Sequence, residues 1–105
     1  MYQIGICDDE PDFLKYLSVL ITRILLSLGI SCRIHTFRNV KELTDYFSQE
    51  NPPVSLDLLL LNPVLEKENS LQLAEHLRKN GTNIPVISVT NNMKYPPPGE
   101  KHHGH

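Results

Sequence analysis

The stretch DLLLLNPVLEKENS, from Asp57 to Ser70, gives the first indication of the fold. Its four consecutive leucines, Leu58 to Leu61, are apolar on both faces, as in a parallel strand that helices cover on both sides. The run ends at Asn62, a polar residue followed by a proline. A buried strand that ends in this way places a polar side chain at the edge of a sheet, where it can contribute to a site.

The rest of the chain alternates between strand-like and helix-like segments. Apolar or alternating runs predict strands over residues 2–7, 31–37, 58–61 and 84–90. Helical periodicity predicts helices over residues 11–28, 40–47 and 71–80. The order β-α-β-α-β-α-β favours an α/β fold with a parallel sheet and helices on both faces.

Several residues are typical of helix ends. Pro11 suits the first turn of the first helix, and Gly29 suits its end. Asn39, followed three residues later by Glu42, is typical of a helix cap with a reciprocal partner. Ser70 is expected to cap the third helix.

Composition excludes some classes of protein. The chain has 105 residues, of which 40% are hydrophobic and 21% charged, as in one small globular domain. A formal net charge of -2 does not favour a nucleic-acid partner, and no apolar run is long enough to span a membrane. Cys7 and Cys32 form no paired motif and are expected to be buried thiols, so we expect a cytoplasmic location.

The chemical signal lies at the carboxyl ends of the predicted strands. Asp8 and Asp9 follow the first strand, Asn62 follows the third, and Thr90 ends the fourth. Ligands of parallel α/β sheets bind at this edge, so we expect these side chains to converge there. Asp57 precedes its strand and is expected at the opposite edge, where it could not act together with Asp8.

The ordered motifs CDDE, DLLLLN and IPVISVT resemble the receiver domain of bacterial response regulators, in particular the branch found in front of LytTR-type DNA-binding domains. The resemblance covers residues 2–90 and implies a flavodoxin-like, three-layer fold. It implies that Asn62 occupies the position of the phospho-accepting aspartate and that Thr90 occupies that of the switch hydroxyl. It also implies that Asp8, Asp9 and the backbone carbonyl of Val64 are the remaining Mg²⁺ ligands.

The chain departs from the receiver pattern at several positions. Glu66 stands where proline is usual, and Ser70 stands where glycine is usual. The family continues with a helix, a strand bearing a lysine and a further helix, whereas residues 91–105 contain three consecutive prolines. We therefore expect a truncated receiver-like domain over residues 1–92. Residues 93–105 are expected to form a disordered tail, whose His102, His103 and His105 are a less favoured metal site.

Two classes of function follow from these residues. An amide cannot form an acyl phosphate, and Asn62 removes one negative charge from the metal site, so at most a weak Mg²⁺ site is expected. The chain is then a degenerate, non-enzymatic receiver that binds signalling partners without phosphorylation. The alternative is a fragment of a phosphate-accepting, Mg²⁺-dependent receiver. Asn62 could also simply bond the nearby backbone.

The first helix is apolar around much of its circumference. One stripe is expected to face the sheet, namely Phe13, Leu17, Leu20, Ile24 and Leu28. A second stripe, Leu14, Ile21 and Leu25, is expected to bind a signalling protein or a second copy in a homodimer. Neighbouring loops or residues 96–98 could instead cover this stripe, and pairing at the edge of the fourth strand is a rival route.

Overall fold

The structure is a computed structural model that describes residues 1–48, 55–69, 71–73, 75 and 84–90. Its elements follow one another along the chain as β1 (Tyr2–Cys7), α1 (Pro11–Ser27), β2 (Cys32–Phe37), α2 (Val40–Ser48), β3 (Leu58–Leu61), α3 (Pro63–Glu68) and β4 (Val86–Ser88). All strand pairs are parallel, and the strand order is β2-β1-β3-β4. The predicted α/β class with a parallel sheet is therefore confirmed, and the arrangement is compatible with a flavodoxin-like fold.

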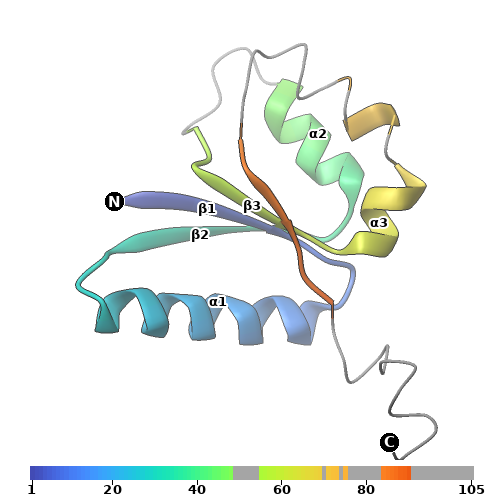
Figure 1. Cartoon of the computed structure of the whole chain (residues 1–105). Coiled ribbons are helices and arrows are strands. Elements are labelled where there is room, and N and C mark those ends of the chain that lie inside the picture. Colours follow the sequence, from blue (N-terminus) through green and yellow to red (C-terminus); the bar gives the residue numbers. More distant parts are fainter. Residues whose placement is uncertain (49–54, 70, 74, 76–83, 91–105) are drawn as a thin grey trace, which may run out of the picture.

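The sheet separates two layers of helices, with α1 on one face and α2 and α3 on the other (Figure 1). The alternation of side chains along the strands produces this division. Ile4, Ile6 and Leu60 pack with Leu14 and Leu17 of α1. The opposite face carries Cys7, Leu59 and Leu61, which pack with Phe37 and with the α2 residues Val40, Leu43 and Phe47.

The phase of α1 differs from the prediction. Leu14 and Leu17 are buried, and Ile21 and Leu25 pack against the same core cluster. By contrast, the side chains of Leu20, Ile24 and Leu28 are 36%, 50% and 67% exposed. The predicted stripe is therefore wrong for Leu20, Ile24 and Leu28, whereas its first two members, Phe13 and Leu17, do pack on the sheet side of the helix. Leu14 is buried and Ile21 and Leu25 are partly buried against the sheet side of the helix, so this second stripe is not the exposed surface that the prediction required.

The end of α1 follows the prediction from Gly29. The N–H groups of Gly29 and Ile30 donate to the carbonyls of Leu26 and Leu25 at 2.9 and 2.8 Å. This pair of bonds satisfies the last carbonyls of the helix and requires a left-handed residue, which Gly29 supplies with φ of 76°. The turn directs the chain into β2.

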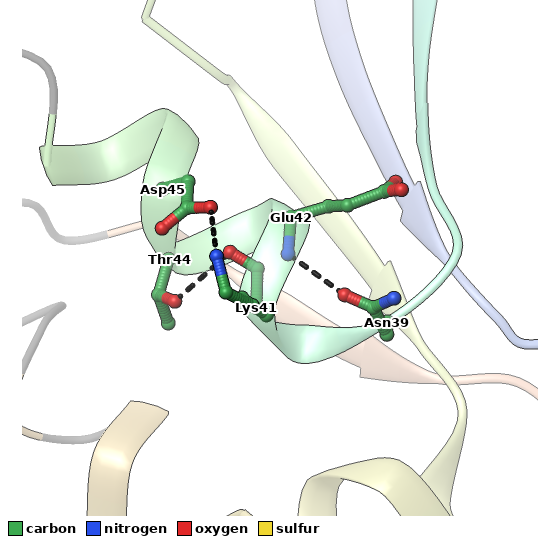
Figure 2. Close-up of polar contacts among 5 residues, drawn as sticks. All are labelled: Asn39, Lys41, Glu42, Thr44 and Asp45. Atoms are coloured by element: carbon green, nitrogen blue, oxygen red, sulfur yellow. Dashed lines mark hydrogen bonds and ion pairs between the residues drawn. The ribbon is translucent and has the colours of Figure 1, made fainter.

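The start of α2 confirms the predicted cap. The side chain of Asn39 accepts a hydrogen bond from the N–H of Glu42 at 2.8 Å (Figure 2). The Glu42 carboxylate accepts in turn from the N–H of Arg38 at 2.9 Å, one residue before the position that a capping box uses. Lys41 and Asp45 form an exposed ion pair one turn further along, also shown in Figure 2.

Two segments differ from the predicted boundaries. β4 is shorter than the predicted strand over residues 84–90, and α3 was not predicted. Of the predicted helix over residues 71–80, residues 71–73 and 75 are helical and Leu73 is buried in the core, while the remainder lies outside the described residues. Ser70 and the tail over residues 93–105, with its histidines, also lie outside them.

Candidate functional site

The candidate site lies where β1 and β3 end side by side. Cys7 and Leu61 are register partners, so Asp8 and Asn62 follow them at the same edge of the sheet. The N–H of Asn62 donates to the carbonyl of Cys7 at 3.1 Å, and the N–H of Asp8 donates to the carbonyl of Phe37 at 3.0 Å. These bonds extend the parallel ladder and fix the backbone positions of both residues.

The side chains of Asp8 and Asn62 form a buried polar pair. The Nδ2 group of Asn62 donates to Oδ2 of Asp8 at 3.0 Å. The other carboxylate oxygen of Asp8 accepts from the N–H of Glu10 at 2.8 Å. Asp8 is only 2% exposed and Asn62 only 3%, so the two groups meet in a place that water hardly reaches. A buried carboxylate is tolerated when its oxygens accept hydrogen bonds, as they do here.

Asn62 also begins α3. Its Oδ1 accepts from the N–H groups of Val64 and Leu65 at 2.8 and 3.3 Å, and Pro63 occupies the first helical position. Only one orientation of the amide serves both neighbours, because the oxygen can accept from the helix while the nitrogen donates to Asp8. The predicted bond from Asn62 to the nearby backbone is therefore confirmed, and it coexists with the contact to Asp8.

These residues do not fit Mg²⁺ as they stand. A magnesium ion needs oxygen ligands in near-octahedral geometry. Both oxygens of Asp8 already accept hydrogen bonds, and Asn62 presents a nitrogen donor to the position between the two side chains. Within the described part of the chain, no group of three or more His, Cys, Asp or Glu residues is placed to hold a metal ion.

The thiol of Cys7 is affected by its position behind this pair. Burial, together with the negative charges of Asp8, Glu42 and Asp9, raises the pKa of Cys7 from 9.0 to about 12, and burial is the largest of these causes. Cys7 is 1% exposed and belongs to the α2-side core. The thiol therefore remains protonated and acts as a small apolar core residue, as the sequence predicts.

In contrast to the buried pair, three other predicted site residues are exposed: Asp9, Val64 and Thr90. Asp9 is exposed, so the predicted acidic pair is divided between the protein interior and its surface. Thr90 is exposed and lies beyond Ser88, the last residue of β4, and its role as a switch hydroxyl stays a prediction. Val64 belongs to the first turn of α3, and its carbonyl as a metal ligand also stays a prediction.

Asp57 lies at the amino edge of the sheet, as predicted. Its carboxylate accepts from the N–H of Gln3 at 2.8 Å, and its own N–H donates to the carbonyl of Gln3 at 2.7 Å. These two bonds align the starts of β1 and β3. Asp57 is thus at the opposite end of β3 from Asn62 and contributes to strand register.

Sequence reasoning missed α3 and its link to β4. The hydroxyl of Ser88 donates to the Glu66 carboxylate at 2.9 Å, which connects the two elements beside the buried pair. Glu66 is the residue that stands where receivers usually have proline. The dipeptide Asn62–Pro63 was the signal for α3, because asparagine favours the cap position and proline favours the first helical position.

Comparison of the chain with protein-family models, with curated proteins and with solved structures gave no match. The class that the fold defines is a parallel-sheet α/β protein with a buried carboxylate–amide pair at the carboxyl edge of its sheet. The resemblance to receiver domains stays a prediction from the motifs. In the described part of the chain, no helix has the length and apolar character needed to cross a bilayer.

Proposed function

We propose that this chain is a degenerate receiver domain, a protein-interaction module of bacterial two-component signalling in the cytoplasm that acts without phosphorylation. The observation that carries the proposal is the hydrogen bond from the Asn62 amide to the buried Asp8 carboxylate. In a working receiver the corresponding position holds an aspartate that attacks phosphorus while Mg²⁺ neutralises the developing charge. An amide supplies neither the nucleophile nor the second negative charge.

The amide instead takes over part of the structural role of a cation. Two ionised carboxylates at this separation would repel each other, and a bound cation or a retained proton would be needed to hold them together. The Nδ2 group of Asn62 carries partial positive charge and bonds Asp8 directly, at 3.0 Å. The pair is then stable without a metal, so its arrangement does not depend on a phosphorylation cycle. This supports a site with one fixed state.

Asn62 is also protected from conversion to aspartate. Asparagine deamidates readily when the backbone nitrogen of the next residue attacks the side-chain carbonyl, and that step requires an N–H group. Pro63 has none. The amide is therefore expected to persist in the folded protein, which argues against a latent phospho-acceptor.

The exposed surface supports an interaction role. Several large apolar side chains of α1 are more than a third exposed: Tyr16, Val19, Leu20, Ile24 and Leu26. A helix on the surface of a monomer usually presents a polar outer face. Apolar groups gathered on one element are typical of surfaces that bind other proteins.

The test is incubation with acetyl phosphate and Mg²⁺, followed by intact mass spectrometry. We expect no phosphoryl adduct on the native chain. A receiver domain that retains its aspartate serves as the positive control for the phosphodonor. A stable adduct that maps to residues near Asn62, and that disappears in Asp8→Asn, would refute the proposal and favour the phosphate-accepting alternative.

A further inference from the structure

The outward side of α1 carries a stripe of four residues with a charged residue at each end and two apolar residues between them. We call Asp12, Tyr16, Val19 and Arg23 the outer stripe. All four are exposed, with Tyr16 and Val19 at 60% and 45%. Their spacings of four, three and four residues place them along one line on the side of the helix away from Leu14 and the sheet. The outer stripe therefore has an acidic end, an apolar middle and a basic end.

The spacing of the outer stripe reads the same in both directions. When two copies lie antiparallel, Asp12 of each meets Arg23 of the other, and Tyr16 of each meets Val19 of the other. We propose that the outer stripe binds the outer stripe of a second copy in a symmetric antiparallel dimer. The proposal rests on the interaction role above and names its partner. A two-fold axis at the middle of α1 generates all four contacts from one surface.

The charges favour this arrangement over a parallel one. Parallel helices would place Asp12 opposite Asp12 and Arg23 opposite Arg23, which is repulsive. Within the described part of the chain, neither Asp12 nor Arg23 takes part in an ion pair. Both are thus available to a partner, and the antiparallel dimer supplies each with an opposite charge.

The shape of the surface fits the same pairing. Val19 and Arg23 form a ridge between two shallow hollows. One hollow lies on α1 and is bounded by Asp12, Lys15, Tyr16 and Leu20, and the other reaches Ile34 of β2. The Tyr16 ring stacks on Phe13 with centroids 6.3 Å apart, so it is held in place before a partner binds. A ridge beside a hollow on one copy is complementary to the same surface inverted on the other.

The size of the surface sets the expected affinity. The 17 residues of α1 span about 25 Å, so a dimer through this helix buries less than the roughly 800 Å² per partner of a standard interface. We therefore expect reversible dimers with a dissociation constant in the micromolar range or weaker, roughly 10 to 100 µM. The ion pairs are exposed, so added salt should weaken the dimer.

The test is sedimentation equilibrium of the full chain from about 1 µM to about 1 mM, a range that brackets such a constant. Asp12→Arg and Arg23→Asp each convert two attractive contacts of the dimer into two repulsive ones. Each should raise the dissociation constant about tenfold or more. The double exchange, Asp12→Arg with Arg23→Asp, should restore the dimer. Glu68→Arg makes the same charge change as Asp12→Arg on the exposed end of α3 and should leave association unchanged.

Several outcomes would overturn the inference. A monomer throughout the range would do so, as would a dimer that resists both single reversals, which would point to another surface such as the edge of β4. Loss of the dimer in both single variants without recovery in the double exchange would exclude the antiparallel register. Thermal unfolding of each variant separates loss of folding from loss of association. Sedimentation needs no phosphodonor, so its failure is distinct from a phosphoryl adduct in the mass assay.

Discussion

Replacing Asn62 with aspartate tests the physical account of the buried pair. Asn62→Asp exchanges the Nδ2 donor, which lies 3.0 Å from Oδ2 of Asp8, for an oxygen that cannot donate when ionised. The other contacts survive, because a carboxylate caps the N–H groups of Val64 and Leu65 about as well as an amide does. The substitution therefore changes a single contact, the one between the two side chains.

The size of the effect follows from the distance and the burial. The lost bond to a charged group is worth about 1.5–3 kcal/mol. Two unit charges 3.0 Å apart repel by roughly 5.5 kcal/mol at an effective dielectric of 20, which is an upper limit because the pair can retain one proton. We expect a loss of about 2–4 kcal/mol of unfolding free energy at pH 7 without divalent cations, a large share of a typical domain's total.

The loss depends on pH in a defined direction. Repulsion requires both carboxyl groups to be ionised, so the folded variant holds a proton that the unfolded chain releases above about pH 4. The difference in stability between variant and native chain is thus small at about pH 4 or below and grows as pH rises toward neutrality. A loss of similar size at all pH values would assign the effect to packing.

The assay is urea unfolding at pH 7 with and without Mg²⁺. Returning a carboxylate beside Asp8 should create Mg²⁺ affinity, and a ligand at about a hundred times its dissociation constant stabilises the folded state by about 2.7 kcal/mol. The native chain should not respond. The exchange variant, Asp8→Asn with Asn62→Asp, keeps one amide and one carboxylate and should regain most of the stability without Mg²⁺.

Two results would refute this reasoning. The first is a variant Asn62→Asp that is as stable as the native chain at pH 7 without Mg²⁺, because then the two side chains do not interact. The second is an exchange variant that remains as unstable as Asn62→Asp, because then the loss does not come from repulsion between two carboxylates. Equal Mg²⁺ responses of the native chain and Asn62→Asp would count against the predicted metal site.

Three further predictions concern single residues. Native-state alkylation at pH 8.5 should modify Cys32 and spare Cys7, and equal labelling of the two would contradict the burial of the Cys7 thiol. Burial raises the pKa of Cys7 to about 12, so the stability that the protonated thiol contributes should persist below pH 9 and be lost as pH rises toward 12. Asn39→Ala should remove the α2 cap and lower the unfolding free energy by about 1 kcal/mol in urea titration, whereas Asn39→Ser should retain most of it. Ile21→Glu should lower the unfolding free energy by at least about 2 kcal/mol, whereas Ile24→Glu, at an exposed position of α1, should change it by less than about 0.5 kcal/mol. A larger loss for Ile24→Glu than for Ile21→Glu would favour the phase of α1 that the sequence predicts.

The strands, and the face of the sheet on which each of their side chains lies, were predictable because each strand carries its own periodicity. The alternation in β2 assigns Cys32 and Ile34 to one face and Phe37 to the other, and the two core clusters confirm that division. The leucine run of β3 predicts a strand buried on both faces, which it is. The sequence does not determine the short α3, since its six residues give less than two turns of periodicity.

At the candidate site, the sequence predicted which residues meet but not how they bond. The carboxyl ends of β1 and β3 bring Asp8 and Asn62 together, as the topology requires. Asn62 could belong to a degenerate metal site or cap the following helix, and the choice depended on where its side-chain oxygen and nitrogen point. That orientation is set by the N–H groups of α3, an element missing from the prediction.

The phase of α1 was wrong for a reason that lies in Ser18 and Thr22. The predicted phase, with Leu20 toward the sheet, places both hydroxyls on the side of the helix away from the sheet. In the structure the hydroxyl of Ser18 donates to the carbonyl of Leu14, and that of Thr22 donates to the carbonyl of Ser18, both at 2.7 Å. Each hydroxyl is satisfied within its own helix, so it can lie beside the sheet without an unpaired polar group. Because both hydroxyls lie on the sheet side of α1, apolar side chains for which that side has no room lie outside. Tyr16 and Val19 of the outer stripe are among these exposed residues.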